Sequence, residues 1–315
     1  MRVWRRVVLI GVAGATLFAS TAAKAEPRET APPGLSHSFS HVDHGTRGQE
    51  GNGVPGKSRP SRGGSSSNGI SYHGGPVLYN GVKVYLIWYG NWSGNTATTI
   101  LPTLVSGLSG SPYYNINTTY YDGLNRKVPN LVTLGTQTTD AYSQGKSNLS
   151  DGAINAIVAR AISTNALPTD PNGLYMVLTS ADVTKSGFLT QYCGWHTNGT
   201  INGADIKYSF IGNPGSNGAC SVQTSVSPNG NVGADAMASI MAHELEETAT
   251  DPDLNAWWDN RGYENADKCA WTFGSTYTVA NGSKANMKLG GVNGRDFLIQ
   301  QNWVNASGGY CAKSY

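Results

Sequence analysis

Charged residues are scarce in this sequence, and long apolar stretches are almost absent. Asp, Glu, Lys and Arg make up 13% of the 315 residues, against about 25% in an average soluble domain. This composition excludes a coiled coil and argues against a chain that is disordered throughout. The longest apolar stretch runs from Val7 to about Ala19 and has about 13 residues, short of the roughly 20 that span a bilayer. No serine-hydrolase elbow, phosphate-binding loop or dinucleotide fingerprint is present.

The first 25 residues have the three parts of an export signal. A basic start, Met1–Arg6, precedes the apolar stretch, and Ala23-Lys24-Ala25 is a small-x-small cleavage site. We therefore expect residues 1–25 to be a signal peptide that is cleaved after Ala25, and the protein to be secreted. Removing the four basic residues of the signal leaves 18 basic against 20 acidic residues. The resulting net charge near −2 supports neither nucleic acid nor a membrane surface as a partner.

Residues 26–70 are rich in Gly, Ser, Pro, His and Arg and have almost no aliphatic side chains. Such a segment cannot bury enough apolar surface to offset the entropy of ordering, so we expect it to be disordered. Its histidines, His37, His41 and His44, lack ordered spacing and are expected to be solvated. Residues 71–315 contain no second linker and no internal repeat, so we expect one domain there.

Four cysteines lie in the expected domain, and in an exported chain they predict two disulfides. Four cysteines allow three pairings, and the sequence alone leaves the choice open. Short loops favour Cys193–Cys220 and Cys269–Cys311. A zinc site built from these cysteines is disfavoured because no Cys-x-x-Cys pair is present.

Hydrophobic periodicity predicts an α/β (α+β) fold, a mixed sheet with helices packed on it. Asn80-Gly81 lies between two β-prone runs and predicts a hairpin, and Pro102 predicts the start of a helix that runs to about Leu108. The other predicted elements are a helix capped by Ser150 or Asp151, a buried strand over 174–178, a half-exposed strand over 206–210 and a helix over 234–250. After Pro252 the chain is predicted to be irregular and tied down by cysteines.

The predicted helix over 234–250 carries the sequence His243-Glu244-Leu245-Glu246-Glu247. His243 and Glu247 are one turn apart with Glu244 on the same edge, whereas Glu246 is expected to face outward. The spacing is that of the His-Glu-x-x-His zinc signature with Glu in place of the second His. It predicts that His243 and Glu247 bind zinc and that Glu244 is the catalytic general base for a metal-bound water.

A third ligand must come from further along the chain. Glu264 stands 17 residues after Glu247, a separation similar to that in thermolysin-like enzymes, where a nearby Asp orients a ligating His. Asp267 is the candidate for that orienting role. Asp253 falls where metzincin-like patterns place their third ligand, and Asp259 is a weaker alternative.

Five carboxylates are concentrated between Glu244 and Asp253. They fall in the last turns of the helix and just beyond it, where the helix dipole disfavours negative charge, so a cation is expected there. Calcium is the alternative to zinc, because oxygen ligands are plentiful and the motif holds one His. A helix that merely has a charged solvent face is the third interpretation. His196, in Cys193-Gly-Trp-His196, is either an additional ligand, a substrate contact or a structural hydrogen-bonding residue.

Several blocks of the sequence occur in one order and together resemble the EXORDIUM/phosphate-induced protein family, over roughly Tyr72 to Trp303. The blocks include Gly75-Pro-Val, Val84-Tyr-Leu-Ile-Trp-Tyr-Gly90, Gly173–Val183, Cys193-Gly-Trp-His196, Pro228–Asp235, Ala242–Glu247, Asn255-Ala-Trp257, Glu264–Cys269 and Gly294–Gln300. The resemblance implies an extracellular or cell-wall-associated protein, linked in plants to growth, without an assigned reaction. The family pattern keeps Glu264 but usually differs at Asp253, which favours Glu264 as the third ligand.

The leading prediction is a secreted zincin-like metallohydrolase that acts on peptide bonds of an extracellular peptide. The alternative is a non-catalytic binding protein, extracellular or associated with the cell wall, with a structural metal site and a cell-wall polymer as partner. Its aromatic contacts would come from Trp88, Trp92, Trp257 and Trp258, although packing in the core is the expected role for most of them.

Overall fold

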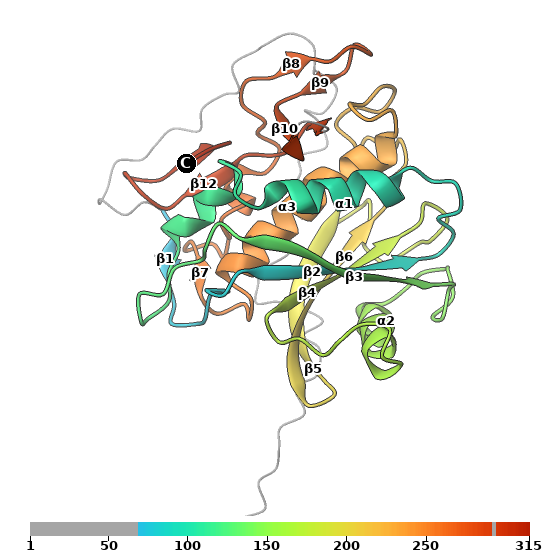
Figure 1. Ribbon diagram of the computed structural model, residues 1–315, viewed down its shortest axis with the longest axis horizontal. Helices are drawn as coiled ribbons and strands as arrows, with labels where there is room; N and C mark the ends of the chain where they lie inside the picture. The colour runs from blue at the N-terminus through green and yellow to red at the C-terminus, as the bar shows by residue number, and fades with distance from the viewer. Residues whose placement is uncertain (1–68, 292–293) are drawn as a thin grey trace, which may run out of the picture.

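The computed structural model describes residues 69–291 and 294–315 (Figure 1). The expected signal peptide 1–25, nearly all of the expected disordered segment 26–70 and its three histidines lie outside the described residues. Three α-helices are described: α1 (Ala97–Leu108), α2 (Asp151–Ser163) and α3 (Val232–Thr250). Two 3₁₀ helices, η1 (Tyr114–Thr119) and η2 (Asp267–Cys269), accompany them. In the part of the chain described here, no helix has the length and apolar character needed to cross a membrane.

The centre of the fold is a five-stranded mixed sheet with the strand order β3-β2-β4-β6-β5. Its strands are β2 (Val82–Tyr89), β3 (Val132–Asp140), β4 (Gly173–Thr179), β5 (Gly194–Ile201) and β6 (Ala204–Gly212). β3, β2, β4 and β6 run parallel, and β5 pairs antiparallel with β6 at the edge. This arrangement confirms the predicted mixed α/β fold.

Helices cover both faces of the sheet, as Figure 1 shows: α1 and α3 lie side by side on one face, and α2 packs on the other. Because helices cover both faces of the sheet, the side chains on both sides of the central strands are buried. These strands therefore have continuous apolar sequences. Every residue of β4 is buried, which confirms the predicted strand over 174–178. The prediction of a half-exposed strand over 206–210 is wrong, because β6 also lies between α2 and α3 and is buried from Ile206 to Gly212.

The sheet contains an Asn-Gly hairpin, but not at the predicted position. Asn202 and Gly203 both have positive φ, 50° and 78°, and join β5 to β6 as a two-residue turn requires. At Asn80-Gly81 no hairpin forms within the described residues. The backbone N–H of Leu78 donates instead to the Ala249 carbonyl of α3, at 3.0 Å, so the run before the turn joins a helix end.

The helix boundaries follow the caps and the buried faces. Ser150 accepts a hydrogen bond from the Ala153 backbone N–H and caps α2, as predicted. α1 does not start at Pro102; it begins five residues earlier, and Pro102 lies inside it. Burial of Ala97, Ile100 and Leu101 holds this first part of α1 against the sheet and α3 despite the missing proline N–H.

The chain after α3 consists of short strand pairs and turns fastened by cysteines, as predicted. Its two-stranded pieces are β8–β9, β10–β11 and β12–β13, and β7 pairs with β1 at the start of the domain. The bounds are β1 Ser71–Tyr72, β7 Trp257–Trp258, β8 Tyr277–Thr278, β9 Lys284–Ala285, β10 Met287–Leu289, β11 Arg295–Phe297, β12 Asn302–Val304 and β13 Tyr310–Ala312. The disulfides Cys193–Cys220 and Cys269–Cys311 confirm the short-loop pairing. The second one ties η2 to β13.

Candidate metal centre

The motif helix α3 lies in the interior of the protein. Asn231 caps it by accepting from the Ala234 backbone N–H, and every residue from Met237 to Thr250 is buried. The sheet and α1 pack against it, and η1 and β11 contact it as well. The interpretation of a charged solvent face is therefore wrong.

Glu246 is fully buried, contrary to the expectation that it faces outward. Its Oε2 accepts a hydrogen bond from Asn302 Nδ2 at 2.5 Å, so a residue of β12 covers this side of the helix. Burial raises the pKa of Glu246 to about 8.

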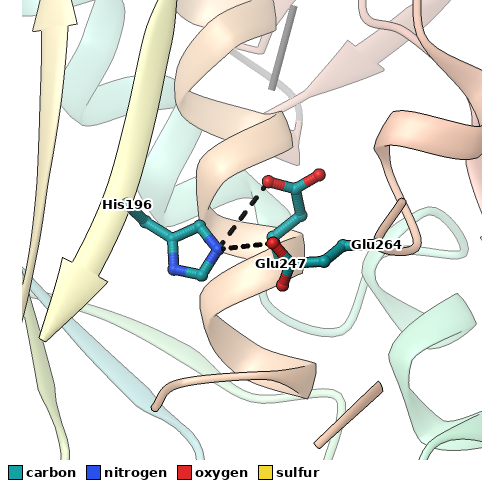
Figure 2. Close-up of side chains that lie close together, drawn as sticks. All are labelled: His196, Glu247 and Glu264. Carbon is teal, nitrogen blue, oxygen red and sulfur yellow. Dashed lines mark hydrogen bonds and ion pairs between the residues drawn. The ribbon is translucent and has the colours of Figure 1, made fainter. Parts of the chain in front are cut away.

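β5 brings a second histidine to α3. A Cβ added at Gly194 would lie 2.4 Å from Ile240 Cγ2 and 3.0 Å from Glu244 Oε1, so the strand and the helix approach closely at this glycine. Two residues later, His196 extends from β5 toward α3 and is 1% exposed (Figure 2).

The third element of the site is the segment Glu264–Asp267, which leads into η2. The backbone N–H of Asp267 donates to Glu247 Oε1 at 3.1 Å, and Asn265 Nδ2 donates to the Glu246 carbonyl at 3.2 Å. These bonds hold the segment against α3 and place Glu264 and Asp267 beside the motif.

Two groups of ligand atoms result, and they share Glu247. In the first, His243 Nε2 lies 2.9 Å from Glu247 Oε1 and 3.6 Å from Asp267 Oδ1. In the second, His196 Nε2 lies 3.2 Å from Glu264 Oε2 and 3.8 Å from Glu247 Oε2 (Figure 2). Within each group the three ligand atoms lie within 4.8 Å of one another. This is a buried His/Glu/Asp cluster that could hold a metal ion.

The structure distributes the predicted site residues differently from the sequence interpretation. His243 and Glu247 are together, but Glu264 pairs with His196 rather than with His243. Asp267 Oδ1 approaches Nε2 of His243, the same ring nitrogen that Glu247 approaches. An orienting carboxylate would bind the other ring nitrogen.

The two alternative third ligands lie outside the cluster. Asp253 Oδ1 is 3.2 Å from Lys207 Nζ, and Asp259 pairs with Arg261 and Lys268. Asp251, which was not predicted as a site residue, is fully buried and accepts the backbone N–H groups of Asn255 and Ala256, both at 2.6 Å. Its only signal in the sequence is its membership of the run of carboxylates after His243.

Burial shifts the pKa values of the cluster toward the protonated forms of its carboxylates. It raises the pKa of Glu247 to about 8, with added repulsion from Asp267, and raises that of Glu264 well above its ordinary value, with repulsion from Asp251. For His243, burial acts to lower the pKa, but Glu247 and Asp267 outweigh it and raise the pKa well above the usual value. Without a metal ion the carboxylates must therefore hold or share protons.

The cluster does not lie in an open cleft. His196, His243, Glu247 and Glu264 are each at most 1% exposed, and the Asp267 side chain is 6% exposed. A pocket does lie along the N-terminal half of α3, lined by Cys220, Ser227, Asp235, Ser239, Ile240 and Trp271, but none of the cluster residues lines it.

The family profile described as "Phosphate-induced protein 1 conserved region" matches residues 70–313. The chain belongs to the EXORDIUM/phosphate-induced protein 1 family. Protein EXORDIUM-like 3 of Arabidopsis thaliana is 32% identical over 292 residues, which cover 81% of this chain and 86% of the relative. Protein EXORDIUM of the same plant is 28% identical over 73% of this chain and 84% of its own length. Protein PHOSPHATE-INDUCED 1 of Nicotiana tabacum is 25% identical over 73% and 83%, respectively.

No solved structure is significantly similar to this EXORDIUM-family chain. The matched region 70–313 contains all three segments that supply the His/Glu/Asp cluster, so the cluster is part of the family domain. The function of the cluster therefore depends on the chemistry of its own histidine and carboxylate side chains.

Proposed function

We propose that this EXORDIUM-family protein is a metalloprotein that holds a divalent metal ion, zinc in the first instance, in the His/Glu/Asp cluster. The observation that supports the proposal is the burial of Glu247 and Glu264 beside two histidines. Both are fully buried, and among the described residues their ion pairs involve histidines and neither Lys nor Arg. Imidazole and carboxylate together are a donor set that suits zinc. The presence of His196 beside them disfavours calcium, which prefers oxygen ligands throughout.

The closed geometry favours a structural role for the ion. Its donors come from β5, α3 and the segment Glu264–Asp267, so bound metal would join three parts of the chain and add its binding free energy to that of folding. Structural sites are closed, whereas catalytic sites keep one position open to water and substrate. Four of the five donors are almost completely excluded from solvent.

Metal analysis of the full chain, purified without chelator, tests this proposal. We expect stoichiometric zinc, a lower midpoint of thermal unfolding after chelation, and recovery when zinc is restored. His243→Ala should bind less metal than the wild-type protein, whereas His73→Ala, at an exposed histidine outside the cluster, should bind as much. The absence of bound metal from the wild-type protein would overturn the proposal.

A zincin-like metallopeptidase is the second candidate, and one arrangement favours it. Glu244 directly follows His243 and its Oε1 lies near Gly194 of β5, the antiparallel edge strand. From Thr197 to Gly199 this strand is half-buried, and Thr200 is exposed, as an edge that receives an extended peptide would be. In this role Glu244 would take the proton from the attacking water.

A control substitution helps to separate the two functions. Glu244→Gln should keep the metal and abolish cleavage of a peptide library, whereas Gln144→Glu, at an exposed residue between β3 and α2, should change neither. If the metal-loaded wild-type protein cleaves no peptide of the library, the catalytic candidate is wrong and the structural role remains.

We further propose that the protein is exported and acts outside the cell on a peptide or a cell-wall polymer. The pattern of residues 1–25 supports export, and the two disulfides are typical of oxidising compartments. Trp88, Trp92 and Trp257 are buried in the core, but Trp258 is half-buried and stacks on exposed His73 with ring centroids 3.6 Å apart. This pair is the candidate surface for stacking on sugars.

N-terminal sequencing of the protein recovered from the growth medium should find Glu26 as the first residue. Binding to insoluble wall polysaccharides should weaken in Trp258→Ala and stay unchanged in Tyr315→Ala, at an exposed aromatic residue that is not part of the Trp258–His73 pair. Failure of the wild-type protein to bind would remove the polysaccharide proposal and leave a peptide as the partner.

A further inference from the structure

The carboxylate of Glu247 lies between the two histidines of the cluster. Its Oε1 is 2.9 Å from His243 Nε2, and its Oε2 is 3.8 Å from His196 Nε2. Glu247 is thus the single residue that belongs to both groups of ligand atoms. Each oxygen has its own histidine and its own second carboxylate, Asp267 in one group and Glu264 in the other.

From this division we infer that the cluster is a dinuclear site, in which Glu247 bridges two divalent metal ions. His243 and Asp267 complete the ligands of one ion, and His196 and Glu264 those of the other. The inference rests on the proposed metal binding and deepens it by fixing the number of ions and their ligands. Paired ions about 3.5–4 Å apart are common in metalloenzymes.

A single ion does not account for all the donors. Zinc binds nitrogen and oxygen ligands at about 2.0–2.2 Å, so donors to one ion lie within about 4.4 Å of one another. Among the described residues, no group of mutually close ligand atoms contains both histidines. An ion in the His243 group would therefore leave His196 and Glu264 without metal, and an ion in the His196 group would leave His243 and Asp267.

Buried carboxylate oxygens at the cluster also lack positively charged or hydrogen-bonding partners. Glu247, Glu264, Asp267 and Asp251 carry four negative charges when ionised, and none of them forms an ion pair with Lys or Arg within residues 69–291 and 294–315. Glu264 Oε1 and Asp251 Oδ2 are buried without a hydrogen-bond partner in the same part of the chain. Glu264 Oε1 is therefore available to the ion of the His196 group.

Metal stoichiometry of the wild-type full chain tests this inference. Zinc-loaded protein should contain two zinc ions per chain, and protein loaded with manganese should show the electron paramagnetic resonance signal of a spin-coupled pair. One ion per chain, or an uncoupled signal, would overturn the dinuclear site and leave the proposed metalloprotein intact. No bound ion would overturn both.

Substitutions in one group at a time assign the ligands. His196→Ala and Asp267→Asn should each reduce the stoichiometry from two ions to one, and each should abolish the spin coupling. Asp253→Asn is the matched control for Asp267→Asn, because Asp253 pairs with Lys207 outside the cluster, and it should keep two ions. If either ligand variant retains two coupled ions, the ligand assignment is wrong. The wild-type measurement decides the stoichiometry even if a variant fails to fold.

Discussion

The backbone N–H of Asp267 donates a hydrogen bond to Oε1 of Glu247, 20 residues earlier in the chain, at 3.1 Å. This bond fixes the segment that carries Glu264 and Asp267 to the motif helix through the backbone, without requiring a metal. The donor atoms are therefore largely in place before an ion binds. A site organised in this way loses little entropy on metal binding, so its affinity should be sensitive to small displacements of α3 or of the segment.

His243→Ala should destabilise the protein strongly, because Glu247 and Asp267 would lose their partner in the interior. Removing one member of a buried ion pair typically costs about 3–5 kcal/mol. Urea unfolding at pH 7, followed by far-ultraviolet circular dichroism, would measure the change. His73→Ala should cost less than about 1 kcal/mol, since His73 is exposed. Equal unfolding midpoints for the two variants would show that the His243 pair contributes nothing to stability.

Gly194→Ala should push β5 away from α3. The new methyl group would lie 2.4 Å from Ile240 Cγ2, and overpacking of this kind costs about 1–3 kcal/mol. Because His196 follows two residues later, the variant should also bind zinc more weakly in a chelator competition titration.

Gly218→Ala is the matched control, because its added methyl group would meet a single atom, Thr224 Cγ2, at an ordinary 3.8 Å. Unchanged zinc affinity in Gly194→Ala would mean that the close approach of strand and helix does not position His196.

The features that local sequence determines were predictable. The unbroken apolar run of β4, the Ser150 cap of α2 and the helical spacing of the motif all follow from neighbouring residues. The disulfide pairing was predictable for a related reason, since short loops cost the least entropy to close. The convergence of His243 and Glu247 follows from a single helical turn.

The features that were missed depend on distant segments. Glu246 was predicted to face solvent because its hydrogen-bond partner, Asn302, is 56 residues away in the chain. In the sequence His196 has no neighbour that could share a ligand site with it, because its partners lie on α3 and in the segment Glu264–Asp267. Only the folded chain shows that Glu264 contacts His196 and not His243, the partner that had been predicted. The Asn80-Gly81 turn failed as a hairpin because the run before it pairs with the end of α3, a contact with no local signal.

The metal-free protein should lose stability as the pH rises from 5 to 8. Glu246 ionises near its ordinary value of 4.5 in the unfolded chain but only near 8 in the folded state, where burial disfavours its charge. The stabilisation is therefore complete below pH 4.5 and is lost as the pH rises toward 8, by about 1.4 kcal/mol for each pH unit. Urea unfolding of chelator-treated protein at pH 5, 6.5 and 8 would measure the loss.

Glu246→Gln should reduce this pH dependence, because the amide does not ionise, while the buried carboxylates of Glu247 and Glu264 keep their share. Asp296→Asn, at a partly exposed carboxylate on β11, should leave it unchanged and serves as the control. Zinc should also reduce the slope in the wild-type protein, since a metal ion favours the ionised form of Glu247. If the free energy of unfolding changes with pH in the same way in the wild-type protein and in Glu246→Gln, the loss of stability comes from groups other than Glu246.

The disulfide Cys269–Cys311 should be required for full metal affinity. Cys269 lies two residues after the segment Glu264–Asp267, which carries one ligand of each proposed ion, so release of this segment weakens both. Replacing both cysteines by serine should cost about 2–4 kcal/mol of stability and weaken the binding of both ions in a competition titration. Cys193 lies three residues before His196, so loss of Cys193–Cys220 should weaken the ion of the His196 group. An unchanged titration after loss of Cys269–Cys311 would show that the hydrogen bonds to α3 suffice to hold the segment.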